Sequence, residues 1–414
     1  MRKTQHWAIF TNNESNKNLL AKRLLKKGHY KDFTPFTSTK ISLFSKITIE
    51  RFIDEEDRHD EKILTKGSKQ ALKTLSSGEQ KKALLQYLFN KNTEAIILDN
   101  PFDNLDSNSL KNLKETLSEK AKTISFIQII SRKEDLLPFI TNYAFLEKET
   151  LNTYSSLKEI NIPNKNTKFL GTIPPPIKPS NYTAKTLIQL KNVNVSFEDK
   201  KVLQNINWTI ERGSFWQLIG SNGSGKTTLL SMITGENPKG YGQELFLFGR
   251  KKGTGESIWD IKKRIGYFTP AMTDKFRGYH TVEQMIISGF NDSIGLYVKP
   301  SATQKKLAKE WLSLINMWHL HDSLYNELSM GQKRLVMTTR AMVKHPDLLI
   351  LDEATAGLDD ASAHLLISFV NKIASDSETA IIFVSHRSER GLNPAYRFVL
   401  NPSSNGSLGT IQPS

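Results

Sequence analysis

Residues 216–234 read WQLIGSNGSGKTTLLSMIT, and this stretch constrains the architecture of the chain more strongly than any other. Its centre, GSNGSGKT at 220–227, fits the pattern G-x-x-x-x-G-K-[ST]. The apolar run WQLIG before it favours a buried strand, and TTLLSMIT after it favours a helix. A strand, a glycine-rich turn and a helix in this order predict a phosphate-binding loop in an α/β fold.

The chemistry expected of this loop follows from its residue types. Glycines let successive backbone N–H groups turn inward around a phosphate, and the following helix adds its positive N-terminus. Lys226 is expected to reach the terminal phosphate oxygens, and the Thr227 hydroxyl to ligate Mg²⁺. The predicted nucleotide-binding residues of the loop are Gly220, Ser221, Asn222, Gly223, Ser224, Gly225, Lys226, Thr227 and Thr228.

Two further segments carry candidate catalytic residues. In LLILDE, 348–353, four apolar residues predict a buried strand that ends at Asp352, which is placed to hold Mg²⁺. Glu353 follows as the candidate for polarising an attacking water, and His386, after the strand AIIFVS, as a contact to the γ-phosphate. Taken alone, the acid pair could be a surface cap and the histidine a structural residue.

An aromatic residue upstream is a candidate for holding the base of a nucleotide. Phe197 precedes Lys226 by 29 residues, in a segment that predicts paired strands. Stacking of a base on an aromatic ring stabilises binding by about 1–3 kcal/mol. Phe197 as an ordinary core residue is the open alternative.

The chain contains an internal duplication. LSSGE at 75–79 recurs as LSMGQ at 328–332, AIILDN at 95–100 as LLILDE, and FIQIISR at 126–132 as IIFVSH at 381–386. Asp99 follows Ser76 by 23 residues, and Asp352 follows Ser329 by the same number. Matched order and spacing indicate two copies of one domain.

A proline-rich stretch, TIPPPIKPSN at 172–181, separates the copies and favours an extended linker. Short apolar strands alternate with helical stretches in each copy, which is typical of mainly parallel sheets flanked by helices. We therefore predict a shortened, degenerate domain at 1–165, a linker at 166–184 and a complete domain at 185–414.

The first copy has lost most of its phosphate loop. Aligned on Lys17, TNNESNKN at 11–18 replaces GSNGSGKT, so the glycines are gone and Asn18 stands where a threonine is needed. Asn100 replaces the catalytic glutamate and Arg132 the histidine. From Lys17 to Ser76 there are 59 residues, against 103 between Lys226 and Ser329. We expect this copy to hydrolyse nucleotide poorly, if it binds one.

Together, the phosphate loop, LSMGQ, LLILDE and VSH resemble the ATP-binding cassette (ABC) superfamily, with two P-loop NTPase domains in tandem. ITGENPKGYGQELFLFGRKKGTGESIWDIKKRIGY and SGFNDSIGLY are similar to tandem cassettes of the ModF/PhrA type. The resemblance implies ATP and Mg²⁺ as ligands, ATP hydrolysis, and head-to-tail pairing of the two domains. In such pairs the signature of one domain, with its Ser and Gly, completes the site of the other.

The two signatures supply Ser76 and Gly78 in the first copy and Ser329 and Gly331 in the second. Our hypothesis is that the first copy persists to donate Ser76 and Gly78 to ATP bound on the second, which gives one competent composite site. The alternative is that LSSGE survives only as a helix cap.

Composition bounds the possible partners. The chain has 414 residues, 38% of them hydrophobic, no cysteine, and a net charge of +15 that is spread over both halves. No long apolar segment or signal peptide is present, so we expect a cytoplasmic protein, free or at the inner face of the membrane. The family resemblance and a plausible helical subdomain around 279–326 favour a membrane transporter subunit, ModF-like and molybdenum-associated by resemblance only. A ribosome or nucleic acid partner is disfavoured by the spread charge and by the 65 residues between Arg132 and Phe197, which leave no room for a long helical connector. A regulatory ATP-binding module is the third class, and Pro270, in the family's glutamine position, puts transport coupling in doubt.

Overall fold

The computed structural model describes residues 4–26, 40–66, 70–91, 93–103, 105–160, 169–276, 278–386 and 389–414. Residues 166–168 of the expected linker lie outside this set. The chain forms two compact units, one of residues 1–164 with 357–361 and the other of residues 165–356 with 362–414. Within the described ranges, no helix is long and apolar enough to cross a bilayer.

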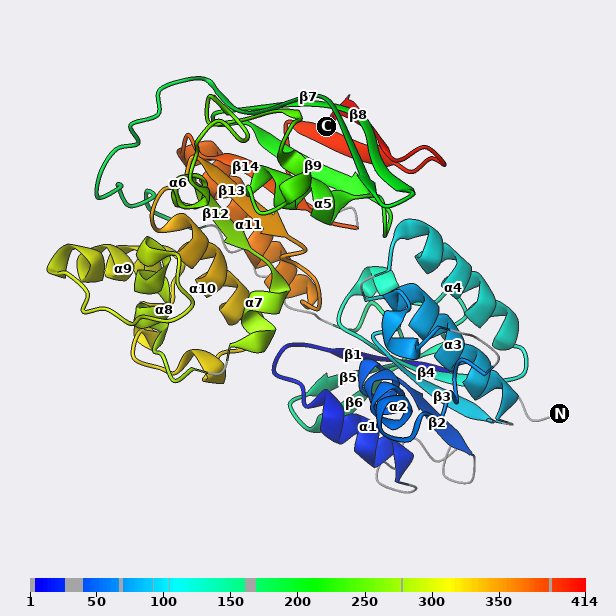
Figure 1. Cartoon of the computed structure of the whole chain (residues 1–414). Helices are drawn as coiled ribbons and strands as arrows, with labels where there is room; N and C mark the ends of the chain where they lie inside the picture. Colours follow the sequence, from blue (N-terminus) through cyan, green and yellow to red (C-terminus); the bar gives the residue numbers. More distant parts are fainter. Residues whose placement is uncertain are drawn as a thin grey trace. The chain divides into compact units, whose positions relative to one another are not determined.

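The first unit contains a six-stranded sheet with the order β2-β3-β4-β1-β5-β6 (Figure 1). Its first five strands in that order are mutually parallel, and β6 pairs with β5 in the antiparallel sense. The strands are β1 (His6–Thr11), β2 (Ile41–Phe44), β3 (Ala95–Asp99), β4 (Ser125–Ile130), β5 (Asn142–Glu147) and β6 (Thr150–Tyr154).

Both faces of this sheet are covered, which explains the continuous apolar runs of its central strands. In β3, Ile96 and Leu98 belong to one hydrophobic cluster, and Ala95 and Ile97 belong to another. The alternation follows from the two-residue period of a strand. The helices of this unit are α1 (Lys17–Leu25), α2 (Lys46–His59), α3 (Ser77–Asn90) and α4 (Ser107–Lys120).

The second unit repeats this topology. Its six-stranded sheet has the order β12-β13-β14-β9-β15-β16, which is the order of the first sheet with each strand replaced by its counterpart in sequence. The duplication read from the motifs therefore extends to the architecture, and the predicted α/β fold class is confirmed. The strands are β9 (Phe215–Gly220), β12 (Ile265–Phe268), β13 (Leu348–Asp352), β14 (Ala380–Val384), β15 (Tyr396–Asn401) and β16 (Leu408–Pro413).

A second, antiparallel sheet with the order β11-β10-β7-β8 belongs to the second unit only, as far as the chain is described. Its strands are β7 (Thr186–Phe197), β8 (Lys200–Glu211), β10 (Glu244–Leu247) and β11 (Arg250–Lys251). Two helices, α5 (Lys226–Ile233) and α6 (Ile258–Arg264), connect the sheets.

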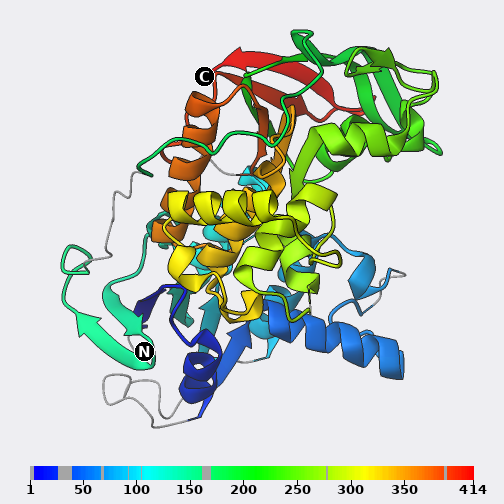
Figure 2. The same ribbon diagram turned by 90° about the vertical axis from the view of Figure 1, so that its left-hand side faces the viewer.

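Helices α8, α9 and α10 pack on one another and form a helical part of the second unit (Figure 2). Between β12 and α10 lie α7 (Pro270–Lys275), α8 (Val282–Ser288) and α9 (Ala302–Leu314). In the first unit, the described residues between β2 and α3 contain α2 as their only α-helix. The remaining helices are α10 (Met330–Met342) and α11 (Asp360–Asp376). Pro270 is the first residue of α7, a position where a proline costs no hydrogen bond.

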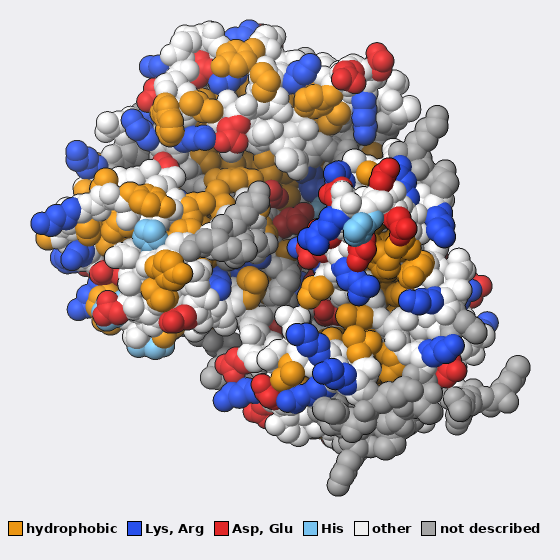
Figure 3. Space-filling model, turned by 60° about the horizontal axis from the view of Figure 1, so that its bottom comes forward, with side chains coloured by type: hydrophobic (Ala, Val, Ile, Leu, Met, Phe, Trp, Pro, Cys, Tyr) orange, Lys and Arg blue, Asp and Glu red, His pale blue; other side chains and the backbone are white. Residues whose placement is uncertain are grey.

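The positive charge of the chain does not form one continuous patch on the face shown in Figure 3. Lys and Arg side chains there are interspersed with Asp and Glu. This distribution agrees with the interpretation of the net charge as solvated surface lysines and arginines.

Candidate functional site

The glycine-rich turn of the second unit adopts the conformation that its sequence requires. Strand β9 ends at Gly220 and α5 begins at Lys226, with Gly225 as its N-cap. Gly223 and Gly225 have φ angles of 76° and 91°, a region that side chains disfavour. A Cβ atom on Gly225 would also lie 2.6 Å from Leu203 Cδ2. The loop therefore depends on glycine for both its backbone angles and its packing on β8.

Lys226 is held at the centre of this turn. Its side chain is buried, and Nζ donates to the carbonyl oxygens of Gly220 at 2.7 Å and Ser221 at 3.0 Å. Nδ1 of His386 lies 3.4 Å away. The backbone amides of the loop remain available, because those of Gly223, Gly225, Thr227 and Thr228 have no acceptor among the described residues.

A cavity of about 250 Å³ opens over the loop. It brings together residues from β8, the phosphate loop, β13 and the turn after β14, as expected where parallel strands end at one edge of a sheet. Most of the predicted site residues of the second copy belong to its lining. The lining consists of Val202, Asn222, Gly223, Gly225, Lys226, Thr227, Thr228, Asp352, Glu353 and His386.

Asp352 occupies the end of β13, facing this cavity. Its carboxylate accepts a hydrogen bond from the Tyr267 hydroxyl at 3.4 Å. Burial, with a smaller contribution from Glu353, raises the pKa of Asp352 to about 6. Burial also raises the pKa of Tyr267, which therefore stays a neutral donor.

Glu353 and His386 form a tight pair. Nε2 of His386 lies 2.5 Å from Glu353 Oε1, and this hydrogen bond is the main reason that the pKa of Glu353 is lowered. Glu353 has a φ of 53°, and its N–H donates to the Val384 carbonyl at the end of β14. The glutamate is thus ionised, and both its backbone and its side chain are fixed.

Phe197 does not line the cavity. It is the last residue of β7, its side chain is 42% exposed, and the Lys239 ammonium lies 5.6 Å from its ring centroid. Val202 on β8 lines the cavity instead. The adenine-platform role of Phe197 stays a prediction.

The sequence reasoning missed Val202 and Tyr267. Tyr267 lies on β12, which pairs with β13, and its register places it opposite Ile350, two residues before Asp352. A signal was present in the motif IGYF, because alternate residues of a strand share a face. Val202 gave no comparable signal.

The first unit preserves the backbone of this site without its chemistry. Asn100, the counterpart of Glu353, has a φ of 42°, and its N–H donates to Ile129 at the end of β4. The same turn is therefore built twice. Asn100 carries no carboxylate to accept a proton, and Arg132, the counterpart of His386, is buried.

The counterpart of the phosphate loop, residues 11–18, is closed by its own hydrogen bonds. The Asn12 amide donates to Ser15 Oγ and the Glu14 amide to Asn12 Oδ1. The amides of Ser15, Asn16 and Lys17 donate to the carbonyls of Asn12, Lys148 and Ser15. Because these donors already have acceptors, a phosphate would have to replace several bonds at once.

Lys17 keeps only a local role. Its Nζ donates to Ser131 Oγ at 2.6 Å, and burial lowers its pKa, opposed by the nearby Asp99 carboxylate. Burial likewise raises the pKa of Asp99. The opposite charges of these two side chains attract each other, while burial disfavours the charged form of each.

Both signature segments begin helices in the same way. Ser76 and Ser329 are the N-caps of α3 and α10, and each forms a capping box with the residue three positions on, Glu79 or Gln332. Ser76 is exposed, whereas Gly331 is buried at the start of α10. Both serines thus cap helices, which the composite-site hypothesis and the cap alternative for LSSGE equally allow.

Comparison with known proteins gives consistent matches. A family model described as ABC transporter matches residues 203–356. The chain is similar to the ABC transporter ATP-binding protein ModF of Escherichia coli, with 38% identity over 330 residues, 77% of this chain and 67% of that protein. An uncharacterized ABC transporter ATP-binding protein of Schizosaccharomyces pombe is 32% identical over 324 residues, 76% of this chain and 66% of that protein.

Among solved structures, cbiO1 from Clostridium perfringens, part of the ABC transporter complex cbiONQ, is 23% identical with a TM-score of 0.48. The alignment covers 54% of this chain and 87% of that chain. The chain spans about two thirds of the length of the two relatives that match both of its halves.

The raised pKa of Asp352 predicts how Asp352→Asn changes stability. An ionised carboxylate at this position destabilises the folded state above its folded pKa of about 6, and the penalty disappears below about pH 4. We expect Asp352→Asn to raise the free energy of unfolding at pH 8 by about 1–3 kcal/mol, and to change it little at pH 4. Thermal denaturation without nucleotide or Mg²⁺ at both pH values measures this, and a pH-independent difference would contradict it.

Proposed function

This chain belongs to the ATP-binding cassette family, and we propose that it hydrolyses ATP at a single competent site on its second unit. The observation that carries the proposal is the Glu353–His386 pair at 2.5 Å beside the buried Lys226. These three groups line one cavity with a glycine loop in which the amides of Gly223, Gly225, Thr227 and Thr228 have no acceptor among the described residues. Glycine turns of this kind bind the phosphates of nucleotides.

The oxygen donors around the cavity fit Mg²⁺. Thr227 offers a hydroxyl and Asp352 a carboxylate, and both line the same cavity from the loop and from the end of β13. Mg²⁺ prefers such hard oxygen ligands and shares its coordination with nucleotide phosphates. When bound, the ion would neutralise charge that develops on the phosphates.

Hydrolysis then depends on groups of the chain itself. In this mechanism, loop amides and Lys226 hold the β- and γ-phosphates, and Glu353 orients a water molecule toward the γ-phosphorus. The water oxygen bonds to phosphorus, the bridging P–O bond breaks, and ADP and phosphate leave as the water proton passes through Glu353 to solvent. His386 holds the Glu353 carboxylate in place, as their hydrogen bond indicates.

Glu353→Gln tests the reaction directly. Glutamine keeps the size of the side chain but cannot accept the proton, so we expect ATPase activity to fall by about 10²–10⁴-fold while ATP binding persists. Phosphate release and equilibrium binding of ATP measure the two effects. Unchanged turnover in the variant would refute the role of Glu353.

The Glu353→Gln variant, which is expected to retain bound ATP, can also be used to identify the partner protein. We propose a membrane transport subunit, because ModF and the yeast relative carry the name ABC transporter ATP-binding protein. A molybdenum cargo has no support beyond the family resemblance. Affinity capture of Glu353→Gln from membrane and soluble fractions is expected to enrich a membrane protein, and enrichment of ribosomes instead would favour the competing class.

Nucleotide stoichiometry tests whether only one site is competent. Because the first loop satisfies its own amides, we expect one ATP per chain, no high-affinity binding in Lys226→Ala, and one ATP per chain in Lys17→Ala. Equilibrium dialysis with a slowly hydrolysed ATP analogue gives these numbers. Two nucleotides per chain, or one that survives in Lys226→Ala, would contradict a single site, and loss of that nucleotide in Lys17→Ala would assign it to the first copy.

We further propose that Ser76 and Gly78 complete this site, as the signature donated by the first copy. The chain offers a matched control, since Ser76 and Ser329 are N-caps with the same capping box. Ser76→Arg is expected to reduce ATPase activity by at least about tenfold, because it removes a hydroxyl and obstructs the γ-phosphate, whereas Ser329→Arg leaves it within about twofold. Equal effects of the two substitutions would mean that the serines act only as caps.

A further inference from the structure

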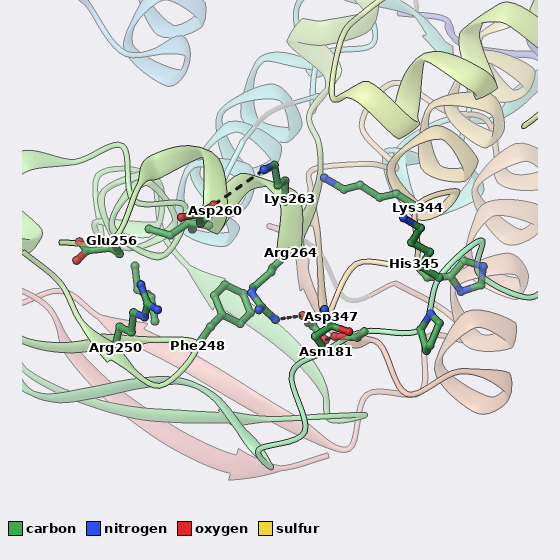
Figure 4. Close-up of a pocket in the computed structure, with 15 residues that line it drawn as sticks. Asn181, Phe248, Arg250, Glu256, Asp260, Lys263, Arg264, Lys344, His345 and Asp347 are labelled. Atoms are coloured by element: carbon green, nitrogen blue, oxygen red, sulfur yellow. Dashed lines mark hydrogen bonds and ion pairs between the residues drawn. The ribbon is translucent and has the colours of Figure 1, made fainter. Parts of the chain in front are cut away.

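A second cavity of the second unit, away from the ATP site, is built for an anion. It has a volume of about 380 Å³ and is lined by the linker residues 178–181, the β10–β11 turn, α6 and the residues between α10 and β13 (Figure 4). Arg264 directly precedes β12, and Asp347 directly precedes β13. The cavity therefore lies at the amino ends of strands whose carboxyl ends carry the ATP site. We call it the linker pocket.

Positive side chains outnumber negative ones in its lining. Figure 4 shows Arg250 from β11, Lys263 and Arg264 from the end of α6, and Lys344 from the segment after α10 around this cavity. The lining contains five cationic side chains and three carboxylates, namely Lys178, Arg250, Lys263, Arg264 and Lys344 against Glu256, Asp260 and Asp347.

The two buried carboxylates are already neutralised by neighbours. Asp347 accepts hydrogen bonds from Ser180 at 2.9 Å, Arg264 at 3.0 Å and Arg212 at 3.1 Å, so two guanidinium groups share one carboxylate. Glu256 lies 3.2 Å from the Lys252 ammonium and accepts from the amides of the turn before it. Of the lining cations, Arg264 is paired with Asp347 and Lys344 with Asp292, which lies outside the lining. The excess positive charge of the cavity therefore comes from Lys178, Arg250 and Lys263.

Arg264 is fixed rather than mobile. Its guanidinium lies 5.1 Å from the Tyr182 ring and 5.6 Å from the Phe248 ring, in addition to its pair with Asp347. Its side chain is still 32% exposed. A guanidinium held in this way presents its remaining N–H groups to the cavity without further loss of conformational freedom.

Two cations of the lining have no structural partner to explain them. Within the described part of the chain, Lys178 and Arg250 form no ion pair, while Lys263 has only a long contact of 4.0 Å to Asp260. The Asp347 network accounts for Arg264 and Arg212 as an anchor of the linker. This network does not account for the positive charges of Lys178, Arg250 and Lys263 in the same lining.

We propose that the linker pocket binds a small molecule that carries a phosphate group. Several cations around one opening match the charge density of a phosphate better than that of a single carboxylate, and arginine binds phosphate oxygens in pairs. The volume is in the range of ligand sites for small molecules. This inference is independent of the proposed ATP hydrolysis and does not require it.

Pyrophosphate is the probe that tests this site, because it carries the phosphate chemistry without a base. The measurement uses the full chain with Lys226→Ala, which removes phosphate binding at the ATP site. We expect saturable binding by calorimetry, weakened by about tenfold by Arg250→Glu and by Lys178→Glu. Lys299→Glu is the matched control, since it makes the same charge change at an exposed lysine outside the lining and should leave binding unchanged.

Three results would overturn the proposal: no saturable binding, the same affinity after Arg250→Glu and Lys178→Glu, or an equal loss with Lys299→Glu. The last would show that net charge alone attracts the anion. Binding of single-stranded RNA that depends on Arg250, without binding of pyrophosphate, would also reject a small-molecule site. Thermal denaturation of each variant establishes that loss of binding does not come from unfolding.

Discussion

The burial of the Lys226 ammonium next to two carboxylates is the interaction on which the site of the second unit depends. A charged group that is almost completely withdrawn from water is stable only with close acceptors, and Lys226 has two loop carbonyls. Those carbonyls belong to the turn in which Gly223 and Gly225 adopt positive φ angles. Asp352 and Glu353 reach the same place because β13 runs parallel to β9, with β14 between them.

The first unit shows that the fold survives when this arrangement is lost. Its sheet keeps the strand order, and its acidic turn keeps the left-handed residue after Asp99, now Asn100. Both features rest on apolar packing and backbone hydrogen bonds, which tolerate the loss of glycine and glutamate. The loop at 11–18 differs from its counterpart, because its backbone amides donate hydrogen bonds to acceptors within the chain. A degenerate site is therefore filled by local hydrogen bonds rather than left as an open cradle.

The sequence predicted those parts of the site that are encoded locally. The phosphate loop, the acid pair and the duplication could be found because each depends on residues close together in the chain. The side chain that packs over the phosphate loop could not be predicted from the sequence. Strands β7 and β8 pair with several register shifts, so the alternation of residues along a strand does not tell which one meets Gly225. This is why the sequence did not indicate Val202 as a residue of the cavity lining. The linker pocket was missed for a similar reason, since Ser180 and Asp347 meet only in the folded chain.

Helices α3 and α10 begin with the same capping box, so capping does not distinguish the signature LSSGE from the signature LSMGQ. A serine that fits a capping box stabilises its helix by about 1 kcal/mol in either copy, so the cap alone gives no reason to assign them different roles. Their difference must come from the loop that each would serve. The loop at 220–227 keeps the amides of Gly223, Gly225, Thr227 and Thr228 without acceptors among the described residues, and its unit carries the Glu353–His386 pair. Most amides of residues 11–18 already have acceptors. If signatures act on the opposite copy, as in the family, then Ser76 serves the competent loop and Ser329 the closed one, and selection on the chemistry would act on Ser76.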